Sequence, residues 1–409
     1  MDQIVSKELN LKKEKLWNAM YIKMIFVALF VSICNNMLNT ALPLYIQDIG
    51  GDKSTAGMVM GVFTIAALVC RPLFGNLVDT KGRKIVLIVG ISIFAISGLG
   101  LGMVTSILLI LVLRAIQGIG ISGFSTSSGT VVADVLPPKR LTEGVGLFGV
   151  SYNISTAIGP SIALVLISSF GYLSVFISSF LICVLGLLLV FTFNYEKKAK
   201  LALQAQEGYV EPEKAKLSLK SAFEKSAIPA SAAQFLLAMP MGFAMTFMPL
   251  FGISAGIENV GMYFTVFALT LLATRFFVGK LADRYGASKV IIPGIILVAL
   301  GMLILSFTTT LTLLLVAAGV IGLGYGCINP TVNAFIMKVS PIERRGAANA
   351  TYYAAFDGGV GIGSMAGGIL VQAIGFSSTF ICLVGVTVAG MAVFFKFARK
   401  QILKSEAAL

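Results

Sequence analysis

Twelve long apolar segments, separated by short polar turns, limit the fold of this chain more than any other feature. Each is about 20 residues long, the length of α-helix that crosses the hydrocarbon core of a bilayer. None shows the apolar–polar alternation of strands in a membrane barrel. Backbone groups in lipid must be hydrogen-bonded within their own segment, so we predict twelve membrane-spanning helices. The predicted spans are residues 21–46, 55–79, 85–104, 107–131, 143–168, 172–194, 229–253, 259–281, 289–307, 311–337, 346–373 and 376–397.

Composition excludes a soluble fold. Hydrophobic residues make up 57% of the 409 residues and charged residues 12%, against about 25% charged residues in a typical soluble domain. A soluble chain of this length cannot hide so much apolar surface from water. The first span is too long for the apolar core of a cleaved signal peptide, so we expect it to be retained. The predicted fold class is an all-α polytopic membrane protein.

Lysine and arginine are distributed unevenly over the loops. If the N-terminus is cytoplasmic, the loops on the other side carry only Lys53. Cytoplasmic loops of membrane proteins are enriched in these residues, so we expect both termini in the cytoplasm. The net charge of +13 then reflects membrane topology, and nucleic-acid binding is not expected. The absence of organelle-targeting signals is typical of a bacterial inner membrane protein.

The residues on which most enzymes and metal sites depend are missing or scattered. The chain has no histidine, the commonest general base and metal ligand. Its five cysteines fall within predicted spans without paired spacing, which is typical of small core residues. No phosphate-binding loop, dinucleotide fingerprint or nucleophile elbow is present. We therefore expect a protein that is not an enzyme and that uses neither a metal nor another cofactor.

The two halves of the chain repeat each other at a constant offset of 204 residues. One offset that aligns several separate regions is hard to obtain by chance. The repeat predicts two six-helix bundles, residues 1–194 and 229–409, joined by a cytoplasmic linker at 195–228. Parallel repeats of this size are the architecture of transporters that move two halves around a central site. The aligned pairs are Arg71 and Arg275, Gly75 and Gly279, Asp79 and Asp283, Gly82 and Gly286, Gly118 and Gly322, Gly120 and Gly324, Gly159 and Gly363, and Gly171 and Gly375.

Three short motifs lie within the first repeat: GNLVDTKGRK after the second span, RAIQGIG in the fourth and GPSIAL in the fifth. On these motifs the chain resembles the major facilitator superfamily, and within it the twelve-helix drug/proton antiporter branch, over essentially its whole length. The third motif is partial, because Ala163 and Leu164 replace its final pair of glycines. The matching residues are Gly75, Leu77, Asp79, Gly82, Arg83 and Lys84 in the first motif, Arg114, Gln117, Gly118 and Gly120 in the second, and Gly159 and Pro160 in the third.

The first motif, Lys84 included, is expected to form a cytoplasmic gate. A tight turn between antiparallel spans needs a positive φ, which Gly75 and Gly82 would supply without steric cost. The resemblance implies that Asp79 faces the N-terminal end of the eleventh helix. It also implies that Arg83 of the loop pairs with the acid that ends the fourth helix, here Asp134. Such contacts would latch the two halves at the cytoplasmic side.

The second repeat gives a comparison for this latch. Asp283 remains, but Ala287 and Lys338 replace the equivalents of Arg83 and Asp134, so both members of the pair are lost together. Joint loss favours a contact and makes the side-chain latch one-sided. The alternative is that the basic residues of the loop are solvated charges that only set the topology.

Charged residues inside spans are costly and often mark functional sites. Arg114 lies within the fourth span, and Asp357, which aligns with Asn153 in the repeat, lies near the middle of the eleventh. Many antiporters of the resembling branch carry an acid in the first helix, where this chain has only asparagines. We therefore expect Asp357 to carry the proton, unless transport is not proton-coupled. The structural alternatives are an ion pair between Asp357 and Arg114, or hydrogen bonds to neighbouring helices.

The cargo cavity is expected to be lined by polar and aromatic residues of the first, fourth, fifth, seventh, tenth and eleventh spans. Few charges and many aromatic groups favour an amphipathic organic solute over an inorganic ion or a sugar phosphate. The alternative for each residue is that it joins neighbouring helices through its amide or hydroxyl group. The candidates are Arg114, Asn36, Asn39, Tyr152, Asn153, Gln234, Asn329, Asn333, Tyr353 and Phe356.

The predicted function is export of small amphipathic organic compounds by alternating access, with proton antiport through Asp357. We expect a monomer whose partners are small-molecule cargo, protons and the lipid bilayer. One alternative keeps the fold and changes the cargo, as in a metabolite or metallophore carrier, or a flippase for lipid-linked precursors. A flippase should have a strongly cationic cavity, which Arg114 alone does not provide. A membrane sensor or scaffold is a further alternative, but it would call for an appended soluble domain.

Overall fold

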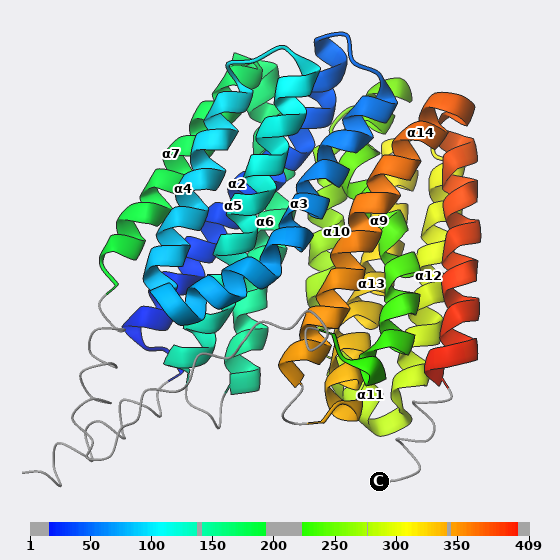
Figure 1. Ribbon diagram of the computed structural model, residues 1–409. Helices are drawn as coiled ribbons and strands as arrows, with labels where there is room; N and C mark the ends of the chain where they lie inside the picture. Colours follow the sequence, from blue (N-terminus) through cyan, green and yellow to red (C-terminus); the bar gives the residue numbers. More distant parts are fainter. Residues whose placement is uncertain (1–15, 137–140, 194–222, 276, 342–344, 400–409) are drawn as a thin grey trace, which may run out of the picture.

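The computed structural model describes residues 16–136, 141–193, 223–275, 277–341 and 345–399. Two groups of long helices stand side by side, one from each half of the chain (Figure 1). Ten helices in the described part are long and apolar enough to cross a membrane. The first half contains α2 (Ala19–Asp48), α3 (Lys53–Lys81), α4 (Arg83–Leu101), α5 (Ile107–Val135), α6 (Leu141–Phe170) and α7 (Tyr172–Phe191). The second half contains η3 (Lys225–Ala227), α9 (Ile228–Ser254), α10 (Gly261–Thr274), α11 (Val278–Tyr285), α12 (Ala287–Ser306), α13 (Leu311–Val339), α14 (Arg345–Val393) and η5 (Phe394–Ala398).

These helices correspond to the twelve predicted spans, and two of them, α10 and α14, differ from the predicted form. α14 holds two of the segments, because its backbone turns at Gly375, where φ is +77°. The predicted eighth span, 259–281, is not one continuous helix, since α10 stops at Thr274 and the short α11 follows it. The chain tightens at this break, where the N–H of Phe277 donates to the carbonyl of Thr274 at 3.2 Å. The all-α membrane fold is confirmed, and the eighth predicted span is divided between α10 and α11.

The repeat is visible in the backbone as pairs of glycines with the same conformation. Gly82 before α4 has a φ of +96°, and Gly286 before α12 has +95°. Gly171 and Gly375 have +76° and +77°. A side chain at such angles is strained, so all four turns depend on glycine. For Gly75 this expectation is wrong, because the residue lies inside α3 and its φ is not positive.

Other repeated glycines let helices approach closely. A Cβ atom on Gly118 would lie 2.2 Å from the backbone oxygen of Phe63 in α3. At the equivalent position, a Cβ atom on Gly322 would lie 2.5 Å from the backbone oxygen of Phe267 in α10. Gly120 faces the backbone of α4 in the same way. Small residues permit such contacts between membrane helices, and here they hold α5 and α13 against equivalent neighbours.

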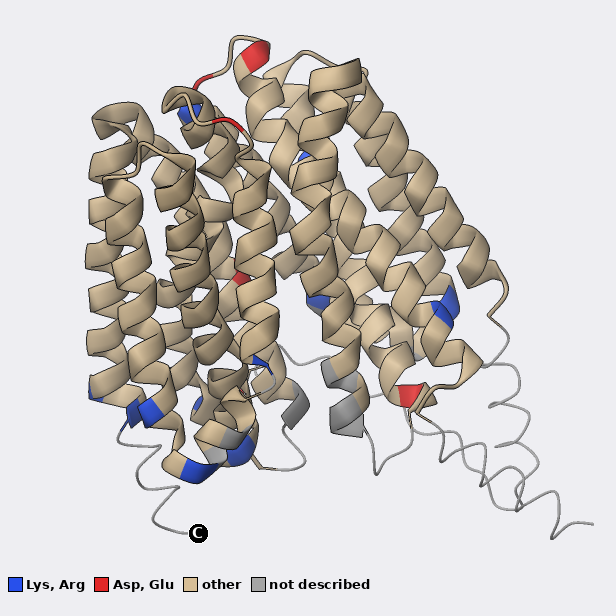
Figure 2. Cartoon of the chain, turned by 180° about the vertical axis from the view of Figure 1, so that it is seen from behind, with Lys and Arg blue, Asp and Glu red and all other residues tan. Residues whose placement is uncertain are grey.

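The two ends of the bundle differ in charge. Lysines and arginines gather at the end where α2 begins and α3 ends, which we call the basic end (Figure 2). The opposite end carries Asp48, Asp52, Lys53 and Glu258 in the described chain. Asp52 caps α3 there, and the hydrogen bonds that its carboxylate accepts from Thr55 hold its pKa below the usual value. The uneven charge of the loops is thus also a property of the folded chain.

Two close contacts between the halves lie on the side of the opposite end. Between α3 and α14, a Cβ atom on Gly57 would lie 2.5 Å from the backbone oxygen of Ser364. Between α6 and α10, the hydroxyl of Thr265 donates to the carbonyl of Ala157 at 3.1 Å. These two helix pairs are equivalent in the repeat, and together they join the halves in the part of the bundle that lies towards the opposite end.

Candidate functional site

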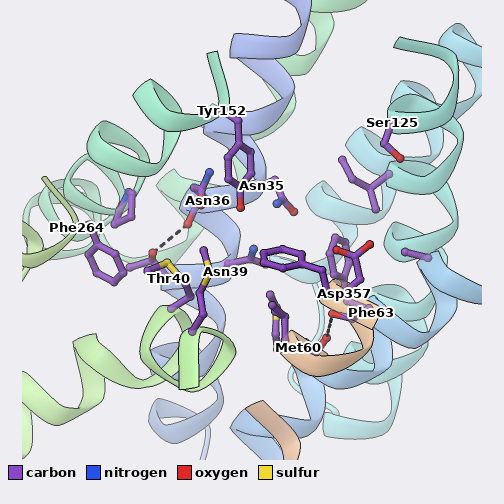
Figure 3. Close-up of a pocket in the computed structure, with 18 of the residues that line it drawn as sticks. Asn35, Asn36, Asn39, Thr40, Met60, Phe63, Ser125, Tyr152, Phe264 and Asp357 are labelled. Carbon is purple, nitrogen blue, oxygen red and sulfur yellow. Dashed lines mark hydrogen bonds between the residues drawn. The ribbon is translucent and has the colours of Figure 1, made fainter. Parts of the chain in front are cut away.

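A cavity of about 190 Å³ lies between the two halves and is lined by helices of both (Figure 3). The first half contributes α2, α3, α5 and α6, and the second half contributes α9, α10 and α14. Much of the wall is apolar or aromatic, with Met60, Phe63 and Phe264 as examples. Among the described lining residues, Arg71 and Asp357 are the only charged ones. The arrangement suits a small organic molecule held mainly by apolar contact.

The structure brings some of the predicted site residues to this cavity and leaves others outside it. Those that line the cavity are Asn36, Asn39, Tyr152, Pro160, Phe356 and Asp357. Those that do not line it are Arg114, Asn153, Gln234, Asn329, Asn333 and Tyr353.

The amides of α2 form one polar wall of the cavity. The side chain of Asn36 donates to the hydroxyl of Ser155 in α6 at 3.1 Å and to the carbonyl of Ser32 at 3.0 Å. Gly159 allows α6 to approach at this level, because a Cβ atom on it would lie 2.8 Å from the Cβ of Asn36. The partial third motif therefore has a packing role here, and its Pro160 lines the cavity.

An ion pair at the cavity joins the two halves. Nη2 of Arg71 in α3 lies 2.5 Å from Oδ2 of Asp357 in α14. The guanidinium carbon also lies 5.9 Å from the ring centre of Tyr353, so this predicted residue contacts the ion pair although it does not line the cavity. The alternative pairing of Asp357 with Arg114 is wrong in this structure. Because its partners belong to different halves, the pair must break when the halves separate at this level.

Sequence reasoning missed Arg71. The residue lies inside the second predicted span, about two helical turns before Asp79, and the repeat copies it as Arg275. A charge at that depth is a functional signal by itself. What the sequence does not contain is the contact, since Arg71 and Asp357 are distant in the chain and meet only where α3 crosses α14.

Arg114 lies behind the cavity wall. It is 1% exposed, and its guanidinium donates to Gln117 at 2.6 Å, to Asn39 at 2.9 Å and to the carbonyl of Val59 at 3.3 Å. Its guanidinium carbon is 4.1 Å from the ring centre of Phe63. Both Asn39 and Phe63 line the cavity. Arg114 therefore acts on the cavity by positioning two of its wall residues.

The polar candidates of the second half join helices to one another. Gln234 in α9 donates to Asn329 in α13 at 2.9 Å. The hydroxyl of Tyr352 in α14 donates to the carbonyl of Asn329 at 3.2 Å, and Asn333 donates to Asn349 at 3.2 Å. These bonds fit the alternative in which buried amides link helices. Asn153 borders a separate void of about 10 Å³ between α6 and α10.

The proposed cytoplasmic gate is only partly described. Nε of Arg83 lies 3.1 Å from Oδ2 of Asp134, so the expected ion pair forms. Both partners belong to the first half, where the pair joins the start of α4 to the end of α5, so this ion pair does not itself connect the two halves. Lys84 donates to the carbonyls of Phe191 and Phe193 at the end of α7. The side chains of Asp79 and Asp283 lie outside the described part.

Comparisons with known proteins agree with this architecture. Residues 24–262 and 230–407 match the family model of the Major Facilitator Superfamily. The staphylopine export protein of Staphylococcus aureus is 25% identical over 370 residues, which cover 88% of this chain and 91% of that protein. The multi-drug resistance efflux pump PmrA homolog of Lactococcus lactis is 24% identical over 325 residues, covering 77% and 78%.

A solved structure shows the same fold at lower identity. It is a bacterial homolog to the human lysosomal transporter Spinster, in an inward-facing and occupied conformation. The TM-score is 0.75 at 14% sequence identity, and the match covers 94% of this chain and 97% of that one. At this identity the likeness concerns the fold alone.

Proposed function

Because the chain belongs to the Major Facilitator Superfamily, we propose that it exports small amphipathic organic compounds by alternating access and is driven by proton antiport. Membership of the family makes it a multi-pass membrane transporter, and relatives named as exporters and efflux pumps make it an efflux transporter. The class of cargo, the use of protons and the orientation are our proposal. We place both termini in the cytoplasm of a bacterial cell and take the working unit to be a monomer.

The ion pair between Arg71 and Asp357 carries the proposal. It bridges the two halves within the cavity, so its formation and loss are tied to their relative movement. A proton on the Asp357 carboxyl removes the charge that holds Arg71. The neutral carboxyl no longer binds the guanidinium as an ion pair, and the two halves are then free to separate at this level. This is how one proton would be linked to one conformational change.

The cavity wall supports an amphipathic cargo. Apolar and aromatic side chains make up much of the lining, and the amides of α2 provide hydrogen bonds at one side. Such a wall binds a molecule with an apolar body and a few polar groups, and it tolerates changes of shape better than a site built from many directed bonds. The efflux-pump relative is in accord with broad specificity.

A dedicated exporter of one metabolite is the second candidate. The observation in its favour is the relative named as a staphylopine export protein, which covers 88% of this chain. Growth-inhibition tests of an efflux-deficient host, with and without the protein, separate the candidates. Protection against many unrelated compounds supports broad efflux, and the absence of any protection supports a dedicated carrier.

The mechanism is tested by Asp357→Asn, which keeps the shape of the side chain and cannot titrate. In proteoliposomes we expect this variant to lose pH-gradient-driven accumulation of ethidium while passive counterflow of the same dye continues. Asp48→Asn, at an exposed acid of the opposite end, is the matched control and should pump normally. The variant must first be shown to be monodisperse in detergent, because loss of Asp357 leaves Arg71 without its partner. A folded variant that still pumps against a gradient would show that Asp357 is structural.

A further inference from the structure

The repeat supplies a second arginine whose acid is missing. Arg275 in the second half stands at the position of Arg71, and Asn153 in α6 stands at the position of Asp357. The first arginine pairs with Asp357 across α3 and α14. The equivalent interface, between α10 and α6, keeps the cation and carries an uncharged amide in place of the carboxylate. Within the described residues, Arg275 takes part in no ion pair.

The guanidinium of Arg275 reaches across the interface to α6. Its Nη1 and Nη2 atoms lie 3.1 and 3.7 Å from the point where a Cβ atom of Gly149 would stand. Gly149 is one helical turn before Asn153, so the two lie on the same face of α6. In the other interface this position is held by Tyr353, whose ring lies against Arg71. The glycine thus lets the guanidinium of Arg275 lie directly against α6, at the position that a tyrosine holds beside Arg71.

A second hydrogen-bond donor at this interface is also unused. Asn153 is 4% exposed, and its Nδ2 atom is buried with no hydrogen-bond partner among the described residues. Leaving a buried donor without a partner is unfavourable, so such groups normally have a ligand or a partner. Asn153 borders the small void between α6 and α10 together with Leu271, one helical turn before Arg275. The buried Nδ2 of Asn153 and the exposed guanidinium of Arg275 therefore lie along one interface, and neither has an acceptor among the described residues.

We propose that Arg275 and Asn153 form a binding site for a carboxylate group of the cargo. A guanidinium binds a carboxylate through two parallel N–H bonds, and the amide NH2 adds a further donor. The carboxylate would take the place that the side chain of Asp357 takes beside Arg71. This rests on the proposed transport function and extends it: the cargo includes organic anions and zwitterions, whose carboxylate would join α10 to α6 as Asp357 joins α14 to α3.

The test measures binding to the purified full-length chain in detergent at constant ionic strength, with benzoate as the probe. Benzamide has the same shape and no charge. We expect benzoate, and not benzamide, to raise the midpoint of thermal unfolding. Arg275→Gln should weaken the apparent affinity for benzoate by about tenfold or more, as expected for loss of a charged hydrogen bond. Arg284→Gln removes the same charge from an exposed site of the basic end and should leave benzoate binding unchanged.

A second variant tests the geometry without any added ligand. Asn153→Asp restores the acid that the repeat lacks, so it should raise the unfolding midpoint when Arg275 is present. In the Arg275→Gln background the same change should lower the midpoint, because the new carboxylate has no cation to pair with. With Arg275 present, Asn153→Asp should also abolish the stabilisation by benzoate, because its own carboxylate occupies the site. Equal effects of Asn153→Asp in both backgrounds would overturn the proposed pairing. So would a wild-type chain that benzoate does not stabilise, or an Arg275→Gln variant that it stabilises equally. Because transport is not measured, a chain that pumps ethidium and fails this test keeps the proposed function and loses only the carboxylate site.

Discussion

Arg114 shows how this protein keeps a charge among apolar helices without an ion pair. It is 1% exposed, and no acid of the described chain pairs with it. Its N–H groups donate to the side chains of Asn39 and Gln117 and to a backbone carbonyl. The flat face of its guanidinium lies over the ring of Phe63. A buried cation is tolerated when its donors are satisfied in this way. The motif residues Arg114 and Gln117 thus act as supports for the cavity wall.

Unlike the buried Arg114, the side chains of the ion pair between Arg83 and Asp134 are each about one-third exposed. Exposed pairs contribute about 0–1 kcal/mol to stability, so a role in folding is small. We expect Arg83→Ala and Asp134→Ala each to change the free energy of unfolding by less than about 1 kcal/mol and to impair transport. The double variant should be little worse than either single one, because the two residues act together.

This prediction is checked by comparing transport rates and detergent unfolding for the four members of the double-mutant cycle. Additive losses of transport would mean that the residues act independently. A large loss of stability in either single variant would mean that the pair serves folding and that the transport defect is secondary.

At the scale of helices, α3 packs closely against α14 on the side of the opposite end. Gly57 makes this possible, since a Cβ atom there would meet the backbone oxygen of Ser364 at 2.5 Å. Backbone atoms of a helix cannot move aside alone, so a methyl group must push the two helices apart. The halves, which meet along this line, should then separate at that end.

We therefore expect Gly57→Ala to open the cavity towards the opposite end. The reporter is a cysteine at Thr64, which lines the cavity and is buried, in a chain whose native cysteines are replaced by alanine. A membrane-impermeant thiol reagent should label it several-fold faster in Gly57→Ala than in the parent. Gly186→Ala is the control, because the nearest atom to its added Cβ, in Phe30, is 3.9 Å away. Equal labelling rates in the two variants would show that the Gly57 contact does not hold the halves together.

At the scale of the whole molecule, the charge difference between the ends has one consequence for orientation. The basic end also carries the start of α2 and the end of α14, so both termini of the helical bundle are on the side of the lysines and arginines (Figure 2). Basic segments are retained in the cytoplasm. A cysteine at Ser54, in a cysteine-free chain, should react with an impermeant maleimide in intact cells, and one at Ala205 should react only after lysis. Labelling of Ala205 in intact cells would reverse the orientation.

Much of the fold and part of the site could be predicted. The membrane segments and the glycine turn at Gly82 follow from local signals, because hydropathy and positive φ are properties of single segments. The repeat follows from comparing the two halves of the sequence. The ion pair of Arg83 with Asp134 was reached through the resemblance. The break in the eighth span after Thr274 was not predicted, because no proline or glycine marks that position in the sequence.

The sequence by itself determined that this is an all-helical membrane protein, because the bilayer requires each segment to hydrogen-bond its own backbone. The constant offset of 204 residues and the acid within the eleventh span can also be read from the chain alone. Only the tertiary structure decided which charges meet. In the folded chain Asp357 forms an ion pair with Arg71, and Arg275 lies beside Gly149. Arg114 instead donates to side-chain amides and lies over the ring of Phe63. The physical reason is that a side-chain contact between helices depends on how two halves pack. That packing depends on many contacts along α3, α6, α10 and α14 together, so it cannot be inferred from any one segment.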